Sequence, residues 1–379
     1  IAPFYEDATN YVLMGRFGNV LLVNGVTDYT DTYPAGSVVR FNITNAAGSR
    51  PFDLSIPGAE MKLVGSDLSP YERETFVESV VIHPAERYTV DVYFAEAGTY
   101  PLVHTSHDIA EGDRRFPMGQ FNISEEDAAV SHHTGFQDLQ TYADVQESAS
   151  ITAQMLDAPF DRYLEFRLDP ENLDIDSLWP LFPCHQDEAG DWRGDCTEQT
   201  KREFTEGLHR WRYEFRNLDL SQSFLSYEPI HWRDHLLPLS QFLTTEDLTW
   251  KITDTNTNLA NTDISDWRFS EGELVKIRVF NNPRSDHPVQ HPMQHPFHMH
   301  GQRMMLIAKD GVPVENHVWK DTILVPGGTT YDIVVEMSNP GIWMAHCHIP
   351  EHLLSGMHFN FVVGEEYFPQ FNLLNGPHE

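Results

Sequence analysis

Two short segments of the 379-residue sequence concentrate side chains that bind transition metals. The first reads HPFHMHG and contains His295, His298 and His300. The second reads HCHIPEHLLSGM and contains His346, Cys347, His348, His352 and Met357. Imidazole, thiolate and thioether groups are ligands of copper and zinc, so both segments predict metal chemistry.

Alternation along an extended strand divides these side chains into two groups, because successive residues point to opposite faces. His346 and His348 therefore share one face, while Cys347 points to the other. His298 and His300 likewise share a face, and the histidine three residues before His298 lies on the opposite one. Two such strands side by side would form two different metal sites back to back.

The two predicted sites have different ligand sets. One collects two imidazoles, one thiolate and a weak thioether, from His295, Cys347, His352 and Met357. This is the ligand set of a blue-copper electron-transfer site. The other collects four imidazoles, enough for part of a copper cluster, from His298, His300, His346 and His348. Zinc is the main competitor, but structural zinc sites usually show CxxC-type spacing, which this sequence lacks, so we assign copper.

The composition restricts the possible partners. The 57 acidic residues against 25 basic ones give a net charge of −32, which excludes a surface for nucleic acid, because phosphate binding needs a basic patch. No stretch approaches the roughly 20 apolar residues of a membrane span. Only six of the basic residues are lysines. An acidic, lysine-poor surface indicates a halophilic or marine source, and an ordinary acidic secreted protein is the alternative.

The remaining cysteines and the N-terminus bear on the compartment. Cys184 and Cys196 lie twelve residues apart in a polar loop, where a local disulfide could close; two free thiols are the alternative. Two Asn-x-Ser/Thr sequons, at Asn42 and Asn122, agree with export. The sequence starts at Ile1 without an initiator methionine, so a removed leader or a larger missing piece is expected. We expect a secreted, periplasmic or extracellular protein.

The chain between these landmarks reads as an all-β protein. From Asn19 onward, short β-branched runs alternate with turn signals at intervals of about ten residues, which is typical of a β-sandwich or barrel. Residues 125–155 are polar and read as a linker, and the strand pattern returns at Tyr163–Leu168 and again from Leu248. We predict two all-β domains, residues 1–124 and 156–379.

At the two histidine segments the chain resembles the multicopper oxidase family, which includes laccases, ascorbate oxidase, bilirubin oxidase and cuprous oxidases. The resemblance extends into LMGRFGNVLLVNG, HWRDHLLPLSQFL and WKDTILVPGGTTYDIVVEMSNPGIWMAHCHI, and it is strongest to prokaryotic three-domain laccase-like enzymes. It implies cupredoxin-like Greek-key β-sandwich or barrel domains. It also implies four copper ions per complete enzyme: type 1, type 2 and a binuclear type 3 pair.

The resemblance assigns a role to each residue that matches. The type 1 copper would be held by His295, Cys347 and His352, with Met357 as axial ligand. His298 would bind the type 2 copper, and the type 3 pair would be bound by His300, His346 and His348. Cys347 would carry electrons between the sites. Glu351 matches a carboxylate that delivers protons to oxygen in some members; a solvated acid is the alternative.

One departure from the family pattern shapes the expected domain organisation. The trinuclear cluster of the family needs eight histidines, and half of them come from HxHG and HxH motifs in the N-terminal domain. Neither motif occurs before His295, and the nearest candidate, His104 with His107, has the wrong parity for one strand face. We therefore expect residues 1–124 to be a copper-free middle domain and residues 156–379 to be the C-terminal domain. The N-terminal domain would be absent from the chain and retained as a separate fragment of the same enzyme.

The resemblance predicts a laccase-type oxidase. Phenols or aromatic amines would give electrons to the type 1 copper near an exposed His295, and dioxygen would be reduced to water at the cluster. A cuprous or manganese oxidase is an alternative, although the methionines form no dedicated run. A type 1 electron carrier is another, but it leaves the four cluster imidazoles without a role. A nitrite reductase is disfavoured, because such enzymes keep type 1 ligands in an N-terminal domain.

Overall fold

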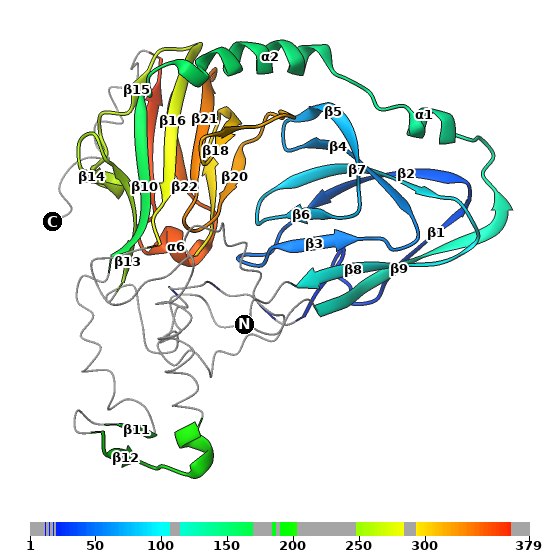
Figure 1. The fold of residues 1–379 in the computed structure, drawn as a ribbon, viewed down its shortest axis with the longest axis horizontal. Helices are drawn as coiled ribbons and strands as arrows, with labels where there is room; N and C mark the ends of the chain where they lie inside the picture. The colour runs from blue at the N-terminus through cyan, green and yellow to red at the C-terminus, as the bar shows by residue number, and fades with distance from the viewer. Residues whose placement is uncertain are drawn as a thin grey trace.

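The computed structural model describes residues 12, 15, 18, 20–106, 114–169, 184–186, 190–202, 248–283 and 293–364. Most of these residues form β-strands, arranged as two β-sandwiches that lie side by side (Figure 1). The prediction of a mainly β protein is confirmed. The division into two domains at the predicted boundaries stays a prediction.

The first sandwich packs a five-stranded sheet against a four-stranded one. The five-stranded sheet has the order β1 (Tyr29–Ala35), β9 (Arg114–Asp127), β8 (Gly98–Ser106), β3 (Phe52–Ser55) and β6 (Val80–Ile82). The four-stranded sheet has the order β2 (Ser37–Thr44), β7 (Arg87–Phe94), β4 (Glu60–Ser66) and β5 (Ser69–Val77). Val90, Val92 and Phe94 alternate along β7 and are almost fully buried, as the period of two requires.

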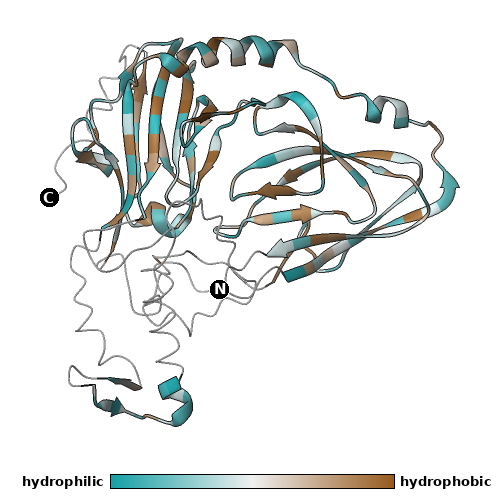
Figure 2. Cartoon of the chain, viewed as in Figure 1, coloured by the Kyte–Doolittle hydropathy of each residue, from teal (hydrophilic) through white to brown (hydrophobic). Residues whose placement is uncertain are grey.

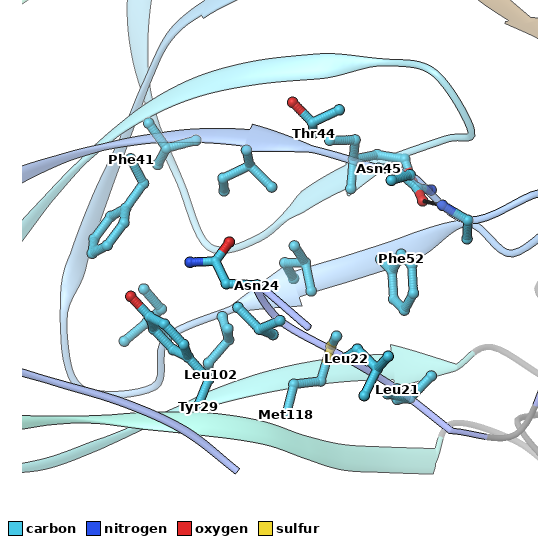
Figure 3. A pocket seen from close by; sticks show the side chains of 18 of the residues that line it. Leu21, Leu22, Asn24, Tyr29, Phe41, Thr44, Asn45, Phe52, Leu102 and Met118 are labelled. Atoms are coloured by element: carbon cyan, nitrogen blue, oxygen red, sulfur yellow. Dashed lines mark hydrogen bonds between the residues drawn. The ribbon is translucent and has the colours of Figure 1, made fainter. Parts of the chain in front are cut away.

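The core of the first sandwich is not completely filled. A partly open cavity of about 650 Å³ lies between its sheets and is lined mainly by apolar side chains, including Leu102 and Met118 (Figure 3). Val92 and Phe121 line the same cavity. Residues 20–25 contribute to the same wall. A gap of this size removes packing contacts from the side chains around it.

The second sandwich packs a seven-stranded sheet against a five-stranded one. The first has the order β14 (Leu259–Ala260), β13 (Thr249–Asp254), β10 (Arg162–Asp169), β16 (Glu273–Asn281), β21 (Thr330–Met337), β18 (Arg303–Lys309) and β19 (Val312–Pro313). The second has the order β15 (Arg268–Phe269), β23 (His358–Val363), β22 (Gly341–Cys347), β17 (His295–Met299) and β20 (Thr322–Val325). Apolar residues alternate with polar ones along several of these strands (Figure 2), so the two sheets bury one continuous core.

The predicted linker contains helices that the sequence pattern did not indicate. Strand β9 runs on to Asp127, and α1 (His133–Gln137), α2 (Ala143–Ala153) and the 3₁₀ turn η2 (Gln154–Asp157) follow. The buried stripe of α2 consists of Val145, Ala149 and Thr152. Two of these side chains are small or polar, so the helical period left only a weak apolar signal.

Beyond the two sandwiches, β11 (Cys184–Gln186) and β12 (Trp192–Gly194) form a small hairpin, and a disulfide joins Cys184 to Cys196. His104 is buried in the first sandwich, where its Nδ1 accepts a hydrogen bond from the amide of Asp53, and His107 lies outside the described residues. Within the described parts of the chain, no helix is both long and apolar enough to cross a membrane.

The two sandwiches contact each other through the 316–321 segment, which leads into β20. The amide of Glu72 on β5 donates to the carbonyl of His317, and the amide of Leu68 donates to the carbonyl of Trp319. The side chain of Asn316 exchanges hydrogen bonds with the backbone of Arg73. The first sandwich therefore fixes residues 316–321, immediately before β20, the strand that neighbours β17.

Candidate metal centre

Strands β17 and β22 carry most of the predicted ligands and lie side by side. Their antiparallel register pairs Phe297 with Cys347 and His298 with His346. Strand β20 flanks β17 on its other side and places Thr322 opposite His298. Because alternate residues point to opposite faces, this register directs one set of ligands into the core and another to the outer face of the sheet.

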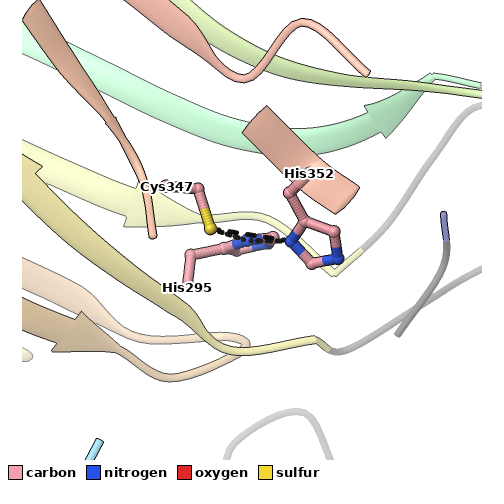
Figure 4. Close-up of side chains that lie close together, drawn as sticks. All are labelled: His295, Cys347 and His352. Atoms are coloured by element: carbon pink, nitrogen blue, oxygen red, sulfur yellow. Dashed lines mark hydrogen bonds between the residues drawn. The ribbon is translucent and has the colours of Figure 1, made fainter. Parts of the chain in front are cut away.

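His295, Cys347 and His352 converge in the core of the second sandwich (Figure 4). The Sγ atom of Cys347 lies 3.6 Å from Nδ1 of His295 and 3.6 Å from Nδ1 of His352. The two Nδ1 atoms are 3.2 Å apart. Two imidazole nitrogens and a sulfur directed at one point form a trigonal His₂Cys set, the arrangement that suits copper. The donor set therefore fits a type 1 copper ion.

Met357 is buried and is joined to this group through the backbone. Its amide donates to the carbonyl of His352, and its carbonyl accepts from the amide of Cys347. The chain returns to Cys347 through the short helix α6 (Pro350–Leu354) and a turn at Gly356, whose φ of +107° favours glycine. The fold thus keeps Met357 beside Cys347, consistent with its predicted axial role.

Burial controls the state of the cysteine. It raises the pKa of the Cys347 thiol far above its ordinary value, although the amide of Ile349 opposes this by donating to the sulfur. A buried thiol of this kind loses its proton only when a cation replaces it. The site therefore couples metal binding to proton release.

The expectation of an exposed His295 is wrong. Its side chain is 0% exposed, as is that of His352. The ring of Trp250 covers both, with centroids 4.7 Å from His295 and 4.4 Å from His352, and Phe166 packs edge-on against His295. The sequence predicted the strands that carry these two aromatic residues, but strand prediction does not say which distant side chain they cover.

The second group of imidazoles lies on the other side of Cys347. Ligand nitrogens of His298, His300 and His346 lie within 4.8 Å of one another, and the Nε2 atoms of His300 and His346 are 3.0 Å apart. The ring of His348 is centred 5.6 Å from that of His346 and 5.9 Å from that of His298. The structure thus brings together all four imidazoles that the strand parity assigned to one face.

Three of these four imidazoles are held in the form that binds metals. Burial lowers the pKa of His298 to about 4; the negative charge of Asp321 opposes this shift, and His300 adds to it. Burial likewise lowers the pKa of His346 to about 4. The pKa of His348 is lowered for the same reason. Neutral imidazole is the ligand form, so the cluster is ready for a cation at neutral pH.

Backbone carbonyls fix the orientation of two rings. Nδ1 of His298 lies 2.8 Å from the carbonyl oxygen of Asp321, and Nδ1 of His346 lies 2.8 Å from that of Cys347. A carbonyl accepts only, so each Nδ1 carries the proton and each Nε2 is free for a metal.

Glu351 lies on α6, four residues after Cys347, and is only 3% exposed. This burial argues against the alternative that it is a solvated surface acid. Its carboxylate approaches Gly15, where an added Cβ atom would lie 3.0 Å from Oε2.

Two family models described as multicopper oxidase match this chain, over residues 7–122 and 234–367. A similar protein, the iron multicopper oxidase fer1 of Mycosarcoma maydis, is 29% identical over 119 residues, which are 28% of this chain and 18% of that protein. Laccase-1 of Arabidopsis thaliana is 35% identical over 60 residues, 16% of this chain and 10% of that protein.

Two solved structures are similar over most of the chain. The multicopper oxidase of Campylobacter jejuni, described as a metallo-oxidase, has a TM-score of 0.58 at 19% identity and covers 93% of this chain. The laccase-like CueO of Ochrobactrum sp. has a TM-score of 0.54 at 18% identity and covers 96%. The chain spans 59% and 63% of those two proteins. At such identity the likeness establishes the fold alone.

These matches correct the predicted make-up of the chain. The interpretation as a middle and a C-terminal domain with the N-terminal domain absent is wrong, because a multicopper oxidase model matches the N-terminal part of the chain, residues 7–122, as well as the C-terminal part. The prediction rested on missing histidine motifs. The strand pattern and the packing determine whether a segment forms a β-sandwich, whereas histidines determine only where it binds metals. The absence of histidine motifs from residues 7–122 therefore does not show which domain of the family they form.

Proposed function

Because this chain belongs to the multicopper oxidase family, we propose that it takes part in the oxidation of a reduced donor at the expense of dioxygen. The observation that carries the proposal is the pair of ligand groups on either side of Cys347, one with two imidazoles and a thiol, the other with four imidazoles. Copper bound there would supply one-electron redox chemistry, with four donor electrons and four protons converting one dioxygen molecule to two waters.

Cys347 provides the connection between the two groups. Its side chain belongs to the first group, while its sequence neighbours His346 and His348 belong to the second. The hydrogen bond from Nδ1 of His346 to the carbonyl oxygen of Cys347 adds a second link of 2.8 Å. Electrons arriving at the sulfur therefore have a short path through this chain's own atoms.

Glu351 would supply protons for oxygen reduction. A carboxyl group that is almost completely buried can hold a proton and release it toward a reacting oxygen, which a solvated acid cannot do selectively. Substituting Glu351→Gln should slow turnover without changing the visible spectrum. An unchanged rate would remove Glu351 from the mechanism.

For the donor, we favour phenols or aromatic amines, as in a laccase. The similarity to Laccase-1 of Arabidopsis and to the laccase-like Ochrobactrum protein supports this choice. Because His295 is buried beneath Trp250, electrons would reach it through the surrounding aromatic side chains rather than through an exposed imidazole.

A metal-ion oxidase is the second candidate, with cuprous, manganous or ferrous ion as donor. The specific support is that a similar fungal protein is an iron multicopper oxidase and that the Campylobacter protein is described as a metallo-oxidase. Measuring kcat/KM for a phenol, an aromatic amine and each metal ion separates the candidates. A value for one metal ion well above that for every organic donor would replace the laccase proposal.

We also propose that the protein works outside the cytoplasm, in the extracellular or periplasmic space. The disulfide between Cys184 and Cys196 supports this, because such bonds persist in oxidising compartments.

The copper content with an EPR spectrum tests the proposal directly. More than one copper per chain, with a blue and a non-blue signal together, is the expected result. A single copper with only the blue signal would instead indicate an electron carrier, and the oxidase proposal would be wrong.

A further inference from the structure

The 316–321 segment is held by the first sandwich immediately before it reaches the imidazole cluster. Each of its last three residues contacts the first sandwich. The amide of Trp319 donates to Oγ of Ser69. Nζ of Lys320 donates to Oγ of Ser66 and forms a buried ion pair of 3.0 Å with Glu86. Asp321 is then the final residue before β20.

Asp321 forms a bidentate, forked ion pair with an arginine of the first sandwich. Nη1 and Nη2 of Arg87, the first residue of β7, donate to the two carboxylate oxygens of Asp321 at 2.9 and 2.6 Å. Arg87 is itself oriented by the carbonyl of Ala85 and by Asp67. A two-point contact of this kind fixes direction as well as distance.

The same aspartate orients His298. Nδ1 of His298 lies 2.8 Å from the backbone carbonyl of Asp321 and 3.0 Å from Oγ1 of Thr322. The Thr322 hydroxyl donates its only proton to Oδ1 of Asp321, so its oxygen acts as an acceptor toward the imidazole. Both neighbours of Nδ1 are therefore acceptors, and His298 must keep its proton there and present Nε2 to the cluster.

We propose that Arg87 is a positioning residue for His298: by fixing both carboxylate oxygens of Asp321, it sets the tautomer and direction of an imidazole on the other sandwich. The inference rests on the proposed function, in which His298 binds copper. It gives the first sandwich a role at the metal centre, although none of the ligands assigned above lies on it.

The chain offers a matched control for the experiment. Arg40 and Asp91 form a similar forked pair, at 2.6 and 2.8 Å, between β2 and β7 of the first sandwich. We would compare Arg87→Gln with Arg40→Gln in the full chain. The first readout is the tautomer of His298 in metal-free protein, from ¹⁵N NMR of histidine-labelled samples. The second is the EPR hyperfine splitting and copper affinity of the non-blue site.

Without Arg87, Asp321 loses its anchor on the first sandwich, so in Arg87→Gln we expect its carbonyl to shift away from Nδ1 and His298 to lose its single tautomer. The non-blue copper should then bind roughly tenfold more weakly, while the blue signal stays the same. Arg40→Gln should match the wild type in both readouts. If Arg87→Gln does not fold, Arg87→Lys carries the test, because it keeps the charge but cannot form the fork. It should show the same changes to a smaller degree.

An unchanged tautomer and an unchanged non-blue signal in the Arg87 variant would overturn the inference, and so would an equal change in Arg40→Gln. Absence of any non-blue copper in the wild type would overturn the proposed function instead. The NMR readout of metal-free protein would then still decide whether Arg87 orients His298.

Discussion

The two sandwiches share an architecture but differ in what their interiors contain. The first contains a partly open cavity of about 650 Å³ lined mainly by apolar side chains. The core of the second holds Cys347 among buried apolar residues, with the imidazoles of His295 and His352 directed at its sulfur. The comparison indicates that the β-sandwich supplies a rigid frame, and that chemistry depends on which inward positions carry ligands.

The difference extends to the charged residues. In the second sandwich, burial keeps Cys347, His298 and His346 neutral at pH 7, since it raises the pKa of the cysteine and lowers those of the two histidines. The first sandwich contributes buried charges instead, above all Glu86 and Asp67 around Lys320. One region is prepared for a cation, and the other surrounds the ammonium group of Lys320, which comes from the 316–321 segment.

The largest expected effect comes from removing the thiol of the second sandwich, and the first sandwich provides the control. Cys347→Ser should abolish the blue absorption and reduce donor oxidation below detection, because a hydroxyl cannot replace the thiolate of the His₂Cys set. The buried histidine of the first sandwich provides the control: His104→Asn should keep the copper content and colour of folded protein. Visible absorption and copper analysis check both. Loss of colour in the His104 variant would show that the first sandwich also holds copper.

The next effect tests the charged contact between the sandwiches. Lys320→Met should lower the free energy of unfolding by about 3–5 kcal/mol, because it removes the buried ammonium group that lies between Glu86 and Asp67. Arg40→Met breaks an ion pair whose arginine is largely exposed and should cost less than about 1 kcal/mol. Urea unfolding measures both. Equal losses in the two variants would mean that the buried ion pairs of Lys320 stabilise the protein no more than the exposed pair of Arg40 does.

Acid stability provides a third test. Burial alone would raise the pKa of Glu86, but Lys320 and His83 lower it to about 2, below the ordinary 4.5. The resulting stabilisation is present above pH 4.5 and is lost as the pH falls toward 2. Between pH 6 and pH 3 it should shrink by about 2 kcal/mol. In Glu86→Gln this component of the pH dependence should disappear. A variant as acid-sensitive as the wild type would contradict it.

The candidate site was more predictable from sequence than its surroundings. Strand parity alone separated Cys347 from His346 and His348, because a period of two is a local property of the backbone. The packing of Trp250 against His295 and the ion pair between Arg87 and Asp321 were not predictable, since each joins residues far apart in the chain. Helix α2 was not predictable for a different reason: two of its three buried side chains, Ala149 and Thr152, are small or polar.

The packing difference predicts opposite signs for one substitution. Val92→Leu adds a methylene at the cavity of the first sandwich and should stabilise the protein by about 0.5–1 kcal/mol. Val275→Leu adds the same group in the fully buried core of the second and should destabilise it by about 1–3 kcal/mol. Thermal unfolding of both variants checks this. Destabilisation by both would mean that the cavity closes in solution.

The last expected effect concerns charge and depends on ionic strength. Residues 1–124 carry 16 acidic against 8 basic residues, whereas residues 125–379 carry 41 against 17, so the part with the metal ligands has the larger negative charge. Its field should favour cationic donors over anionic ones of similar potential, by roughly tenfold in kcat/KM at low salt. The preference should fade as salt rises, since the Debye length falls to about 8 Å at 0.15 M. Measuring kcat/KM for matched cationic and anionic donors across ionic strength tests this. Equal salt dependence for both would mean that donors approach through a locally neutral surface, despite the overall charge.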